Sequence, residues 1–407
     1  MKPAALAVQR PADARLLTVD PQGRLEHHAR HTLPALLQPG DLLVANDAAT
    51  LPASLHGVHG RSGRPIEIRL AGRPTLAVDA VKEFAAVVFG EGDHRLRTED
   101  RPLPPPLAPD DLLLLGCGDG ALRAEDDERP LRARVRRLLG HPRLVLIRFE
   151  GRPEAIWRGL ARHGKPVQYA HLPDPLALWD SWTRIAALPV AFEPPSAGFL
   201  LDWSMLDSLR ARGIGFATLT HAAGLSSTGD AALDARLPLD EPYHLPPSTV
   251  AAIERTRRAG GRIVALGTTV TRALEHAGAR GALQPGEGLA DNRLGASSPL
   301  RIVDALVSGA HEPGTSHHRL LGAFAGAATL ARLDAALDTG GYRAHEFGDS
   351  VLLWRSHGAE GHTADLRRLQ ECKTHSISAS GELQTKPGAD AGVAPLKPRP
   401  ATVADTA

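Results

Sequence analysis

The chain has 407 residues, of which 43% are hydrophobic and only 4% are aromatic, and its formal net charge is +1. This length predicts two domains and an appendage, with interiors built mainly of Leu, Val, Ile and Ala. A net charge near zero excludes the overall basic field of a dedicated nucleic-acid-binding domain, so any RNA contact must come from a local patch.

The sequence favours a cytoplasmic protein. The stretch from Met1 to Asp20 lacks the basic and then apolar blocks of a secretory signal, and no apolar run reaches the roughly 20 residues that a membrane helix needs. Cys117 and Cys372 lie far apart, and neither belongs to a Cys-x-x-Cys pair. Neither a disulfide framework nor a zinc finger is therefore predicted.

Two kinds of segment alternate along the chain. Residues 57–156 carry short apolar runs (PIEIRL, FAAVVFG, DLLLLG, RLVLIRFEG) separated by Gly, Pro and charged residues, a pattern that predicts a small β-barrel. Because residues 1–56 and 157–355 have α/β character, we expect one discontinuous α/β domain into which the barrel is inserted. Residues 356–407 are rich in Ala, Pro, Gly and Lys and are predicted to be disordered.

The run LLLLGCGDG at 112–120 is similar to the glycine-rich first loop of S-adenosylmethionine methyltransferases. Such a loop should open a helix, yet the acidic stretch that follows it ends at Pro130, and proline interrupts helices. We therefore favour a β-turn inside the barrel. A nucleotide-binding loop beneath a long helix is the alternative.

The clearest α/β unit contains a helix that ends at Arg258 and that Ser248 or Thr249 is expected to cap. A Gly-Gly break then leads to an apolar strand over 262–266. After the triplet Gly-Thr-Thr, a second helix is predicted over 270–276.

The triplet and the helix after it suggest a place for a polar ligand. The strand stops at Gly267, and Thr268 and Thr269 open the helix. Free backbone N–H groups and the helix dipole favour an anion there, and Arg272 shares a helix face with Thr269. The structural alternative is a tight turn and a threonine-capped helix with no ligand.

Polar groups also follow or precede three other predicted strands. His221 ends GFATLTH, His311 follows ALVSGA, and Asp349 opens the last strand. Ligands of α/β sheets collect beyond the carboxyl ends of the strands, and a histidine can exchange protons near neutral pH. Taken singly, each histidine has a structural role as its alternative, and only their recurrence at strand ends favours a site.

A set of motifs in a fixed order carries a family resemblance. The stretch PGDLLVANDAATLPA, which includes Asn46 and Asp47, resembles the opening signature of the S-adenosylmethionine:tRNA ribosyltransferase-isomerases of queuosine biosynthesis. Further matching motifs are PPSAGF (194–199), THAAGL (220–225), Glu241 with Tyr243, ALGTTVTRALE (265–275), the stretch 304–311, Ser316, AFAG and YRAHEFGD. They occur in the family's order over nearly the whole chain up to Leu353.

The resemblance implies an α/β domain with an inserted β-barrel. It also implies a reaction, in which the ribosyl part of S-adenosylmethionine moves onto the aminomethyl group of 7-aminomethyl-7-deazaguanine in tRNA. Epoxyqueuosine is formed, and adenine and methionine are released. S-adenosylmethionine is then a substrate, no metal or other cofactor is required, tRNA is the partner, and we expect a monomer.

The resemblance and the strand-end pattern together predict one pocket. The expected catalytic groups are His221, Glu241, His311 and Asp349, with His221 as the proton-transfer group. The expected substrate-binding residues, among which Arg272 anchors an anionic group, are Asn46, Asp47, Ser196, Gly198, Gly267, Thr268, Thr269, Arg272 and Ser316.

Some family motifs differ in this chain. The family usually has Thr-Ala-Gly-Leu-His-Phe where residues 196–201 read Ser-Ala-Gly-Phe-Leu-Leu, so Leu200 replaces a histidine. Ala49 and Ser54 stand where the family has arginines, and arginine loss removes rigid donors for carboxylate or phosphate. Two alternatives follow, a non-catalytic tRNA-binding paralogue and an enzyme that uses the same sulfonium donor with a different amine acceptor.

Overall fold

The computed structural model describes residues 1–116 and 130–356. Both cysteines, residues 117–120 of the glycine-rich run and the predicted disordered tail after Ser356 lie outside the described residues. None of the helices in the described part is long and apolar enough to span a bilayer.

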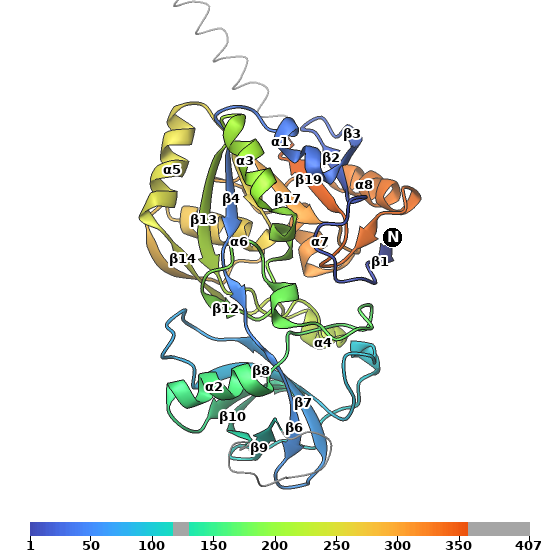
Figure 1. Ribbon diagram of the computed structural model, residues 1–407, viewed down its shortest axis with the longest axis vertical. Coiled ribbons are helices and arrows are strands. Elements are labelled where there is room, and N and C mark those ends of the chain that lie inside the picture. The colour runs from blue at the N-terminus through green and yellow to red at the C-terminus, as the bar shows by residue number, and fades with distance from the viewer. Residues whose placement is uncertain (117–129, 357–407) are drawn as a thin grey trace, which may run out of the picture. The chain divides into compact units, whose positions relative to one another are not determined.

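A mixed sheet underlies the α/β part of the chain (Figure 1). Its four central strands, β13, β4, β15 and β17, are mutually parallel, and antiparallel strands flank them on both sides. In order across the sheet, the strands are β16 (Gly286–Ala290), β14 (Glu241–Leu245), β13 (Gly215–His221), β4 (Leu42–Asn46), β15 (Ile263–Leu266), β17 (Ala305–Gly309), β19 (Ser350–Trp354), β2 (Arg15–Val19) and β3 (Leu25–Ala29).

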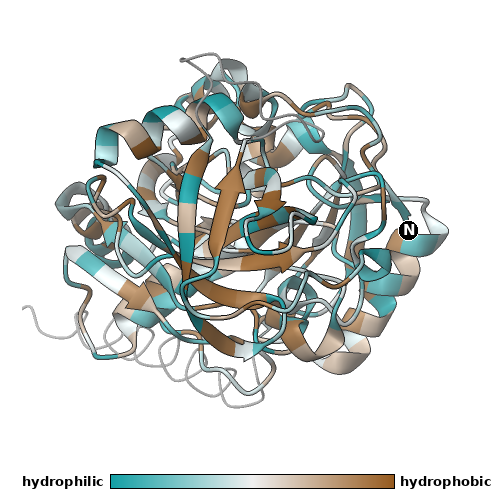
Figure 2. Cartoon of the chain, turned by 90° about the horizontal axis from the view of Figure 1, so that it is seen from below, coloured by the Kyte–Doolittle hydropathy of each residue, from teal (hydrophilic) through white to brown (hydrophobic). Residues whose placement is uncertain are grey.

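The central strands are mainly apolar because both of their faces are covered. Side chains alternate along a strand, so Leu42 and Val44 of β4 enter one core while Leu43 and Ala45 enter the core on the other side. Figure 2, which views the molecule from below, shows hydrophobic strands near the centre and more hydrophilic segments toward the outside.

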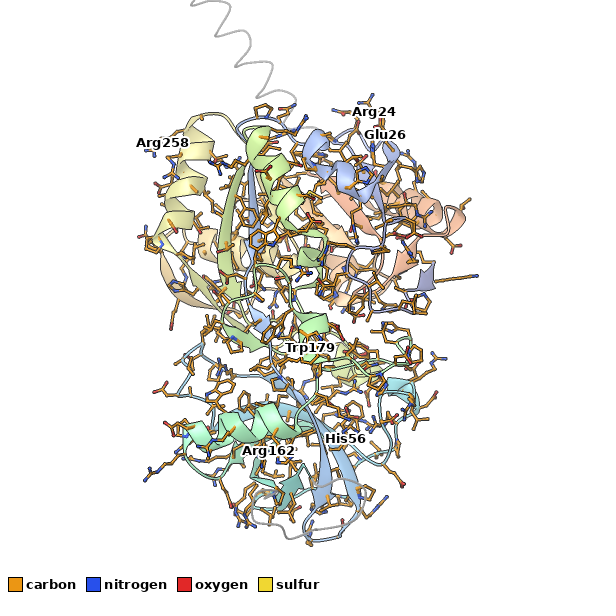
Figure 3. The ribbon with its side chains drawn as sticks, viewed as in Figure 1. Arg24, Glu26, His56, Arg162, Trp179 and Arg258 are labelled. Atoms are coloured by element: carbon orange, nitrogen blue, oxygen red, sulfur yellow. The ribbon has the colours of Figure 1, made fainter. Side chains whose placement is uncertain are left out.

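Helices pack on the two faces of the sheet as amphipathic elements. The helices on the face of Leu42 are α5 (Pro247–Arg258), α6 (Thr268–Gly278), α7 (Ser316–Leu321) and α8 (Ala327–Thr339). On the other face lie α1 (Leu33–Leu36) and α3 (Trp203–Ala211). Charged side chains at element ends project outward, as Figure 3 shows for Arg258 on α5.

A closed antiparallel barrel is inserted between β4 and β13. Its strands, in order around the barrel, are β10 (Leu131–His141), β11 (Leu144–Phe149), β8 (Glu83–Phe89), β7 (Pro65–Gly72), β6 (Ser54–His59) and β9 (Leu112–Leu115). Helix α2 (Pro153–His163) buries Ile156 and Leu160 in the barrel core. The remaining short elements are β1 (Lys2–Pro3), β18 (Arg343–Ala344), β5 (Ala49–Thr50), β12 (Pro189–Ala191), α4 (Ala231–Asp234) and the 3-10 turns Arg30–Thr32, Thr98–Asp100, Leu178–Ser181 and Ser196–Leu200.

The predicted fold class, an α/β domain with an inserted β-barrel, is confirmed. Leu112–Leu115 of the glycine-rich run is a barrel strand, and the first described element after that run is strand β10 and not a helix. The expected cap of α5 is wrong. Proline begins this helix at position 247 with its preset φ, and the Thr249 hydroxyl donates to the carbonyl of Thr218 instead.

Candidate active site

A cavity of about 1040 Å³ lies at the carboxyl ends of the parallel strands. Residues that follow β13, β15 and β17 line it, as expected for ligand sites of α/β sheets. Eight of the predicted site residues are on its wall: Ser196, Glu241, Gly267, Thr268, Thr269, Arg272, His311 and Ser316. Five are not: Asn46, Asp47, Gly198, His221 and Asp349.

The turn between β15 and α6 forms one wall of the cavity. Gly267 has φ 105°, a conformation that L side chains rarely adopt, so only glycine closes this turn without strain. Helix α6 has no side-chain cap, and Thr268 and Thr269 at its first turn face the cavity. Uncapped N–H groups at a helix N-terminus favour a carboxylate or phosphate there.

Arg272 of α6 and Glu241 of β14 form a buried ion pair on the same wall. The Arg272 Nε donates to the carbonyl of Asn292 at 3.1 Å, and Nη2 donates to that of Ala290 at 3.0 Å. Glu241 Oε1 accepts from the backbone N–H of Gly224 at 2.6 Å. Each nitrogen of the guanidinium therefore has a protein partner, and Arg272 holds Glu241 in position.

His221 lies behind this pair and is fully buried. Its Nε2 is 3.4 Å from Oε2 of Glu241, and neither ring nitrogen has a hydrogen-bond partner among the described residues. Burial, followed by the charge of Arg272, holds the pKa of His221 well below its usual range, so the ring is neutral. The structure does not bring His221 to the cavity surface.

The alternation of side chains along β13 explains why His221 points into the core. Leu219 and His221 are two residues apart on β13, so both side chains face the core under α5 and α6. Asn46 fixes the strand end from the neighbouring β4, since its side chain bonds both the N–H and the carbonyl of His221, at 3.0 and 2.9 Å. Asn46 also donates to Thr269 at 3.3 Å, which makes it a support of the cavity wall.

Asp349 opens β19 as expected, but its carboxylate points away from the cavity. It accepts from the backbone N–H groups of Arg15 and Arg343, both at 2.8 Å, and it pairs with both guanidinium groups. Burial raises the pKa of Asp349, but the backbone hydrogen bonds, the side-chain hydrogen bond from Arg343 and the charge of Arg343 together lower it. Asp349 thus joins the ends of β2 and β18, and the structure does not place it with the other predicted catalytic groups.

The other predicted residues off the wall also have local partners. Asp47 accepts from the Thr220 hydroxyl at 2.7 Å. Gly198 sits where an added side chain would meet Thr183 at 2.9 Å. These contacts hold the segments behind the cavity together.

The wall also carries groups that the motifs did not indicate, foremost Glu193. Tyr169 donates its hydroxyl to Oε1 of Glu193, and the N–H of Ser226 donates to Oε2 at 3.1 Å. Burial raises the pKa of Glu193 to about 7, because neither donor carries a charge. In the sequence, Glu193 was indicated as a site residue only by its position directly after the apolar run at 188–192.

A group of histidines lines another part of the cavity. His311 Nε2 lies 2.9 Å from the Ser308 hydroxyl, and the rings of His311 and His317 have centroids 4.6 Å apart. Burial lowers the pKa of His311 well below its usual range and that of His317 to about 4. Both rings are therefore neutral at neutral pH. His171, His345 and Glu346 also line the wall and were not among the predicted site residues, although the last two lie within the motif YRAHEFGD.

Comparison with known proteins identifies relatives over almost all of the described chain. Residues 2–353 match the family described as "Queuosine biosynthesis protein". The S-adenosylmethionine:tRNA ribosyltransferase-isomerase of Azoarcus sp. (strain BH72) is 33% identical over 351 residues, which cover 85% of this chain and 92% of that protein. The protein of the same name from Gloeobacter violaceus is 32% identical over 372 residues, covering 88% and 95%.

A solved structure is also similar. The crystal structure of S-adenosylmethionine tRNA ribosyltransferase from Thermotoga maritima is 22% identical, with a TM-score of 0.43, and covers 86% of this chain and 95% of that one. From the family match over residues 2–353 and the full-length relatives above 30% identity, the chain belongs to the queuosine biosynthesis family of S-adenosylmethionine:tRNA ribosyltransferase-isomerases.

Proposed function

We propose that this chain transfers and isomerises the ribosyl moiety of S-adenosylmethionine onto the aminomethyl group of 7-aminomethyl-7-deazaguanine in tRNA. The products are epoxyqueuosine in the tRNA, adenine and methionine. The observation that carries the proposal is the family match from residue 2 to residue 353, which includes every segment that lines the cavity.

The reaction needs a base for the C5′ proton beside the sulfonium, an acid near the departing adenine, and donors for the methionine carboxylate. Glu193 is our candidate for proton transfer, because it lies on the cavity wall and its pKa of about 7 suits both directions of exchange near neutral pH. His221, the expected group, has no surface on the cavity. A proton-transfer group must reach the substrate, which favours Glu193.

Anchoring is assigned to the first turn of α6. The uncapped N–H groups at Thr268 and Thr269 suit the methionine carboxylate. Arg272 is not assigned to bind the carboxylate itself, since its guanidinium already bonds Glu241 and two backbone carbonyls. Its role in this proposal is to fix Glu241 and the adjoining wall.

A different amine acceptor is the second candidate. Leu200, Ala49 and Ser54 replace a histidine and two arginines of the family motifs, and all three positions are buried. Loss of these donors removes rigid groups for a carboxylate or phosphate, while the turn at Gly267 is retained. A non-catalytic tRNA-binding paralogue is the remaining alternative.

The test uses chromatography to monitor the release of adenine from S-adenosylmethionine, with three acceptors in parallel. These are tRNA carrying the 7-aminomethyl-7-deazaguanine precursor, tRNA carrying unmodified guanine, and small-molecule amines without tRNA. We expect adenine only with the precursor-bearing tRNA. Release with another amine and not with this tRNA would establish the different-acceptor reading, and tRNA binding without S-adenosylmethionine binding would establish the non-catalytic one.

A further inference from the structure

Three metal-ligating side chains from two distant segments meet on the cavity wall. The Nε2 of His171 lies 3.0 Å from Oε2 of Glu346, and the rings of His171 and His345 are stacked with centroids 4.3 Å apart. One ligand atom from each of the three residues lies within 4.8 Å of the other two. Nothing in the proposed ribosyl transfer uses this group.

The backbone holds one member of the group in an uncommon conformation. His345 has φ 70°, and it is one of two non-glycine residues in the described chain with positive φ. Its N–H donates to the carbonyl of Ala310 at 3.3 Å, and its own carbonyl accepts from the N–H of Gly348 at 3.0 Å. Non-glycine residues adopt such a conformation at a cost, and they cluster at functional sites.

The donor set fits one class of ion. Two imidazoles and one carboxylate suit Zn²⁺ and neighbouring first-row divalent metals, whereas Mg²⁺ and Ca²⁺ prefer oxygen ligands. Catalytic zinc sites have three protein ligands and keep a fourth position open. Here all three side chains line the cavity, so a fourth position would face it.

The distances require only side-chain movement. Tetrahedral ligands with metal bonds of about 2.0–2.1 Å lie roughly 3.4 Å apart. His171 and Glu346 are already closer than that, at 3.0 Å. The ligand nitrogen of His345 lies within 4.8 Å of the other two ligand atoms, so its stacked ring must turn for all three atoms to reach one ion. Glu312, 3.7 Å from Nε2 of His345, offers an additional carboxylate nearby.

We propose that His171, His345 and Glu346 form a binding site for a divalent transition-metal ion of the zinc class, with its open coordination position facing the cavity. The proposal goes beyond the ribosyl transfer and does not rest on it. The resemblance to the family implies no metal in that reaction, and the proposed site depends only on the positions of these three side chains. The competing explanation is that His171 and Glu346 form an ion pair that only fixes the loop before β19.

The experiment measures Zn²⁺ binding to the full-length, untagged, chelator-treated protein by calorimetry, with the Co²⁺ absorption spectrum as a second readout. We expect one ion per chain at this site and a Co²⁺ spectrum typical of a four-coordinate site. Replacing a ligand in His171→Ala, His345→Ala or Glu346→Gln should weaken that binding by more than about 100-fold, since even second-shell changes at metal sites cost about 10–100-fold.

His318→Ala is the matched control. This histidine also has one carboxylate partner, Asp334 at 3.0 Å, but it does not belong to the group of three. Glu346→Gln keeps the side-chain shape, so its circular dichroism spectrum and melting temperature without metal check that the fold is intact. Equal Zn²⁺ affinity in the native protein, Glu346→Gln and His171→Ala would overturn the proposal, and so would no binding to the native protein. Neither outcome depends on whether adenine is released from S-adenosylmethionine.

Discussion

The two buried carboxylates of the cavity differ in their partners. Glu241 contacts the guanidinium of Arg272, whereas Glu193 receives hydrogen bonds from two uncharged residues, Tyr169 through its hydroxyl and Ser226 through its N–H. Burial raises the pKa of both carboxyl groups, and at Glu241 the charge of Arg272 opposes that effect. At Glu193 the neighbouring donors are neutral, and its pKa is raised to about 7, so it can gain and lose a proton near neutral pH. The chemical roles of these two groups therefore follow from their neighbours.

Glu193→Gln should lower kcat for adenine release by about 10²–10⁴-fold, because the amide cannot exchange a proton. KM for S-adenosylmethionine should change much less, since the amide keeps the size of the side chain. Steady-state kinetics with precursor-bearing tRNA measures both constants. Glu150→Gln, which changes a carboxylate paired with Arg132 and Arg134 on the barrel, is the control. An unchanged kcat in Glu193→Gln would remove this residue from the mechanism.

Glu193 should also make stability depend on pH. Its pKa is raised from 4.5 in the unfolded chain to about 7 in the folded one, so the native state binds more protons between these values. The free energy of unfolding should therefore fall as pH rises through this window, by up to about 3 kcal/mol. Urea unfolding at about pH 5 and about pH 7.5 should show this loss in the native protein relative to Glu193→Gln. Parallel pH profiles for the two proteins would contradict the assignment.

At the level of single elements, the strand and helix around the Gly-Thr-Thr turn were predictable because their signals are local. The predicted strand at 262–266 is apolar on both faces after Arg262, and the structure has β15 at Ile263–Leu266. The glycine that ends it and the periodic residues after it predict the helix, which the structure extends to Thr268–Gly278. The closed barrel was predictable from regular spacing of short apolar runs.

The composition of the cavity was less predictable, because it depends on contacts between distant residues. The carboxylate of Asp349 is held by a hydrogen bond from the N–H of Arg15, which is 334 positions away in the sequence. His221 ends its strand as expected, yet its alternation with Leu219 directs it into the core, and that face is known only once α5 and α6 are placed. Tyr169 and Glu193 come from irregular segments with no periodic signal.

Arg272 ties α6 to both antiparallel strands at the edge of the sheet, since it bonds Glu241 of β14 and the Ala290 carbonyl of β16. Arg272→Ala should lower the free energy of unfolding by about 3–5 kcal/mol, because a buried carboxylate loses its counter-charge. Urea denaturation measures the change. The double variant Arg272→Met with Glu241→Gln should recover part of the loss, as no charge is then left unpaired. A loss below about 1 kcal/mol, the range of exposed ion pairs, would show that the pair is not buried in solution.

Gly57 closes the barrel at the contact between β6 and β9. A β-carbon at this position would lie 2.0 Å from the carbonyl oxygen of Leu114, which no rotamer relieves. Gly57→Ala should therefore destabilise the chain by about 1–3 kcal/mol or more, seen as a lower Tm. Gly326→Ala is the control, because a β-carbon there meets nothing within 4 Å and its φ is −68°. Equal Tm values for the two variants would mean that β6 and β9 are not paired as described.

For the molecule as a whole, the cavity is lined by residues of the α/β part and by residues of the inserted barrel segment. The sheet part supplies the turn at Gly267, the Glu241–Arg272 pair and the histidines, as expected from the strand ends. Residues 97–99, in the connection after β8, line the same cavity. Cavities lined by two substructures are common ligand sites, and this one joins groups suited to an anion, a proton transfer and a bulky substrate.

We propose that ribosyl transfer to tRNA takes place in this cavity. Its most direct test is mass spectrometry of nucleosides from precursor-bearing tRNA that has been incubated with the protein and S-adenosylmethionine. We predict that the native protein converts 7-aminomethyl-7-deazaguanosine to epoxyqueuosine. Glu193→Gln, with a circular dichroism spectrum like that of the native protein, should leave the precursor almost unchanged. An unaltered precursor with the native protein, under conditions in which it binds both substrates, would contradict the claim.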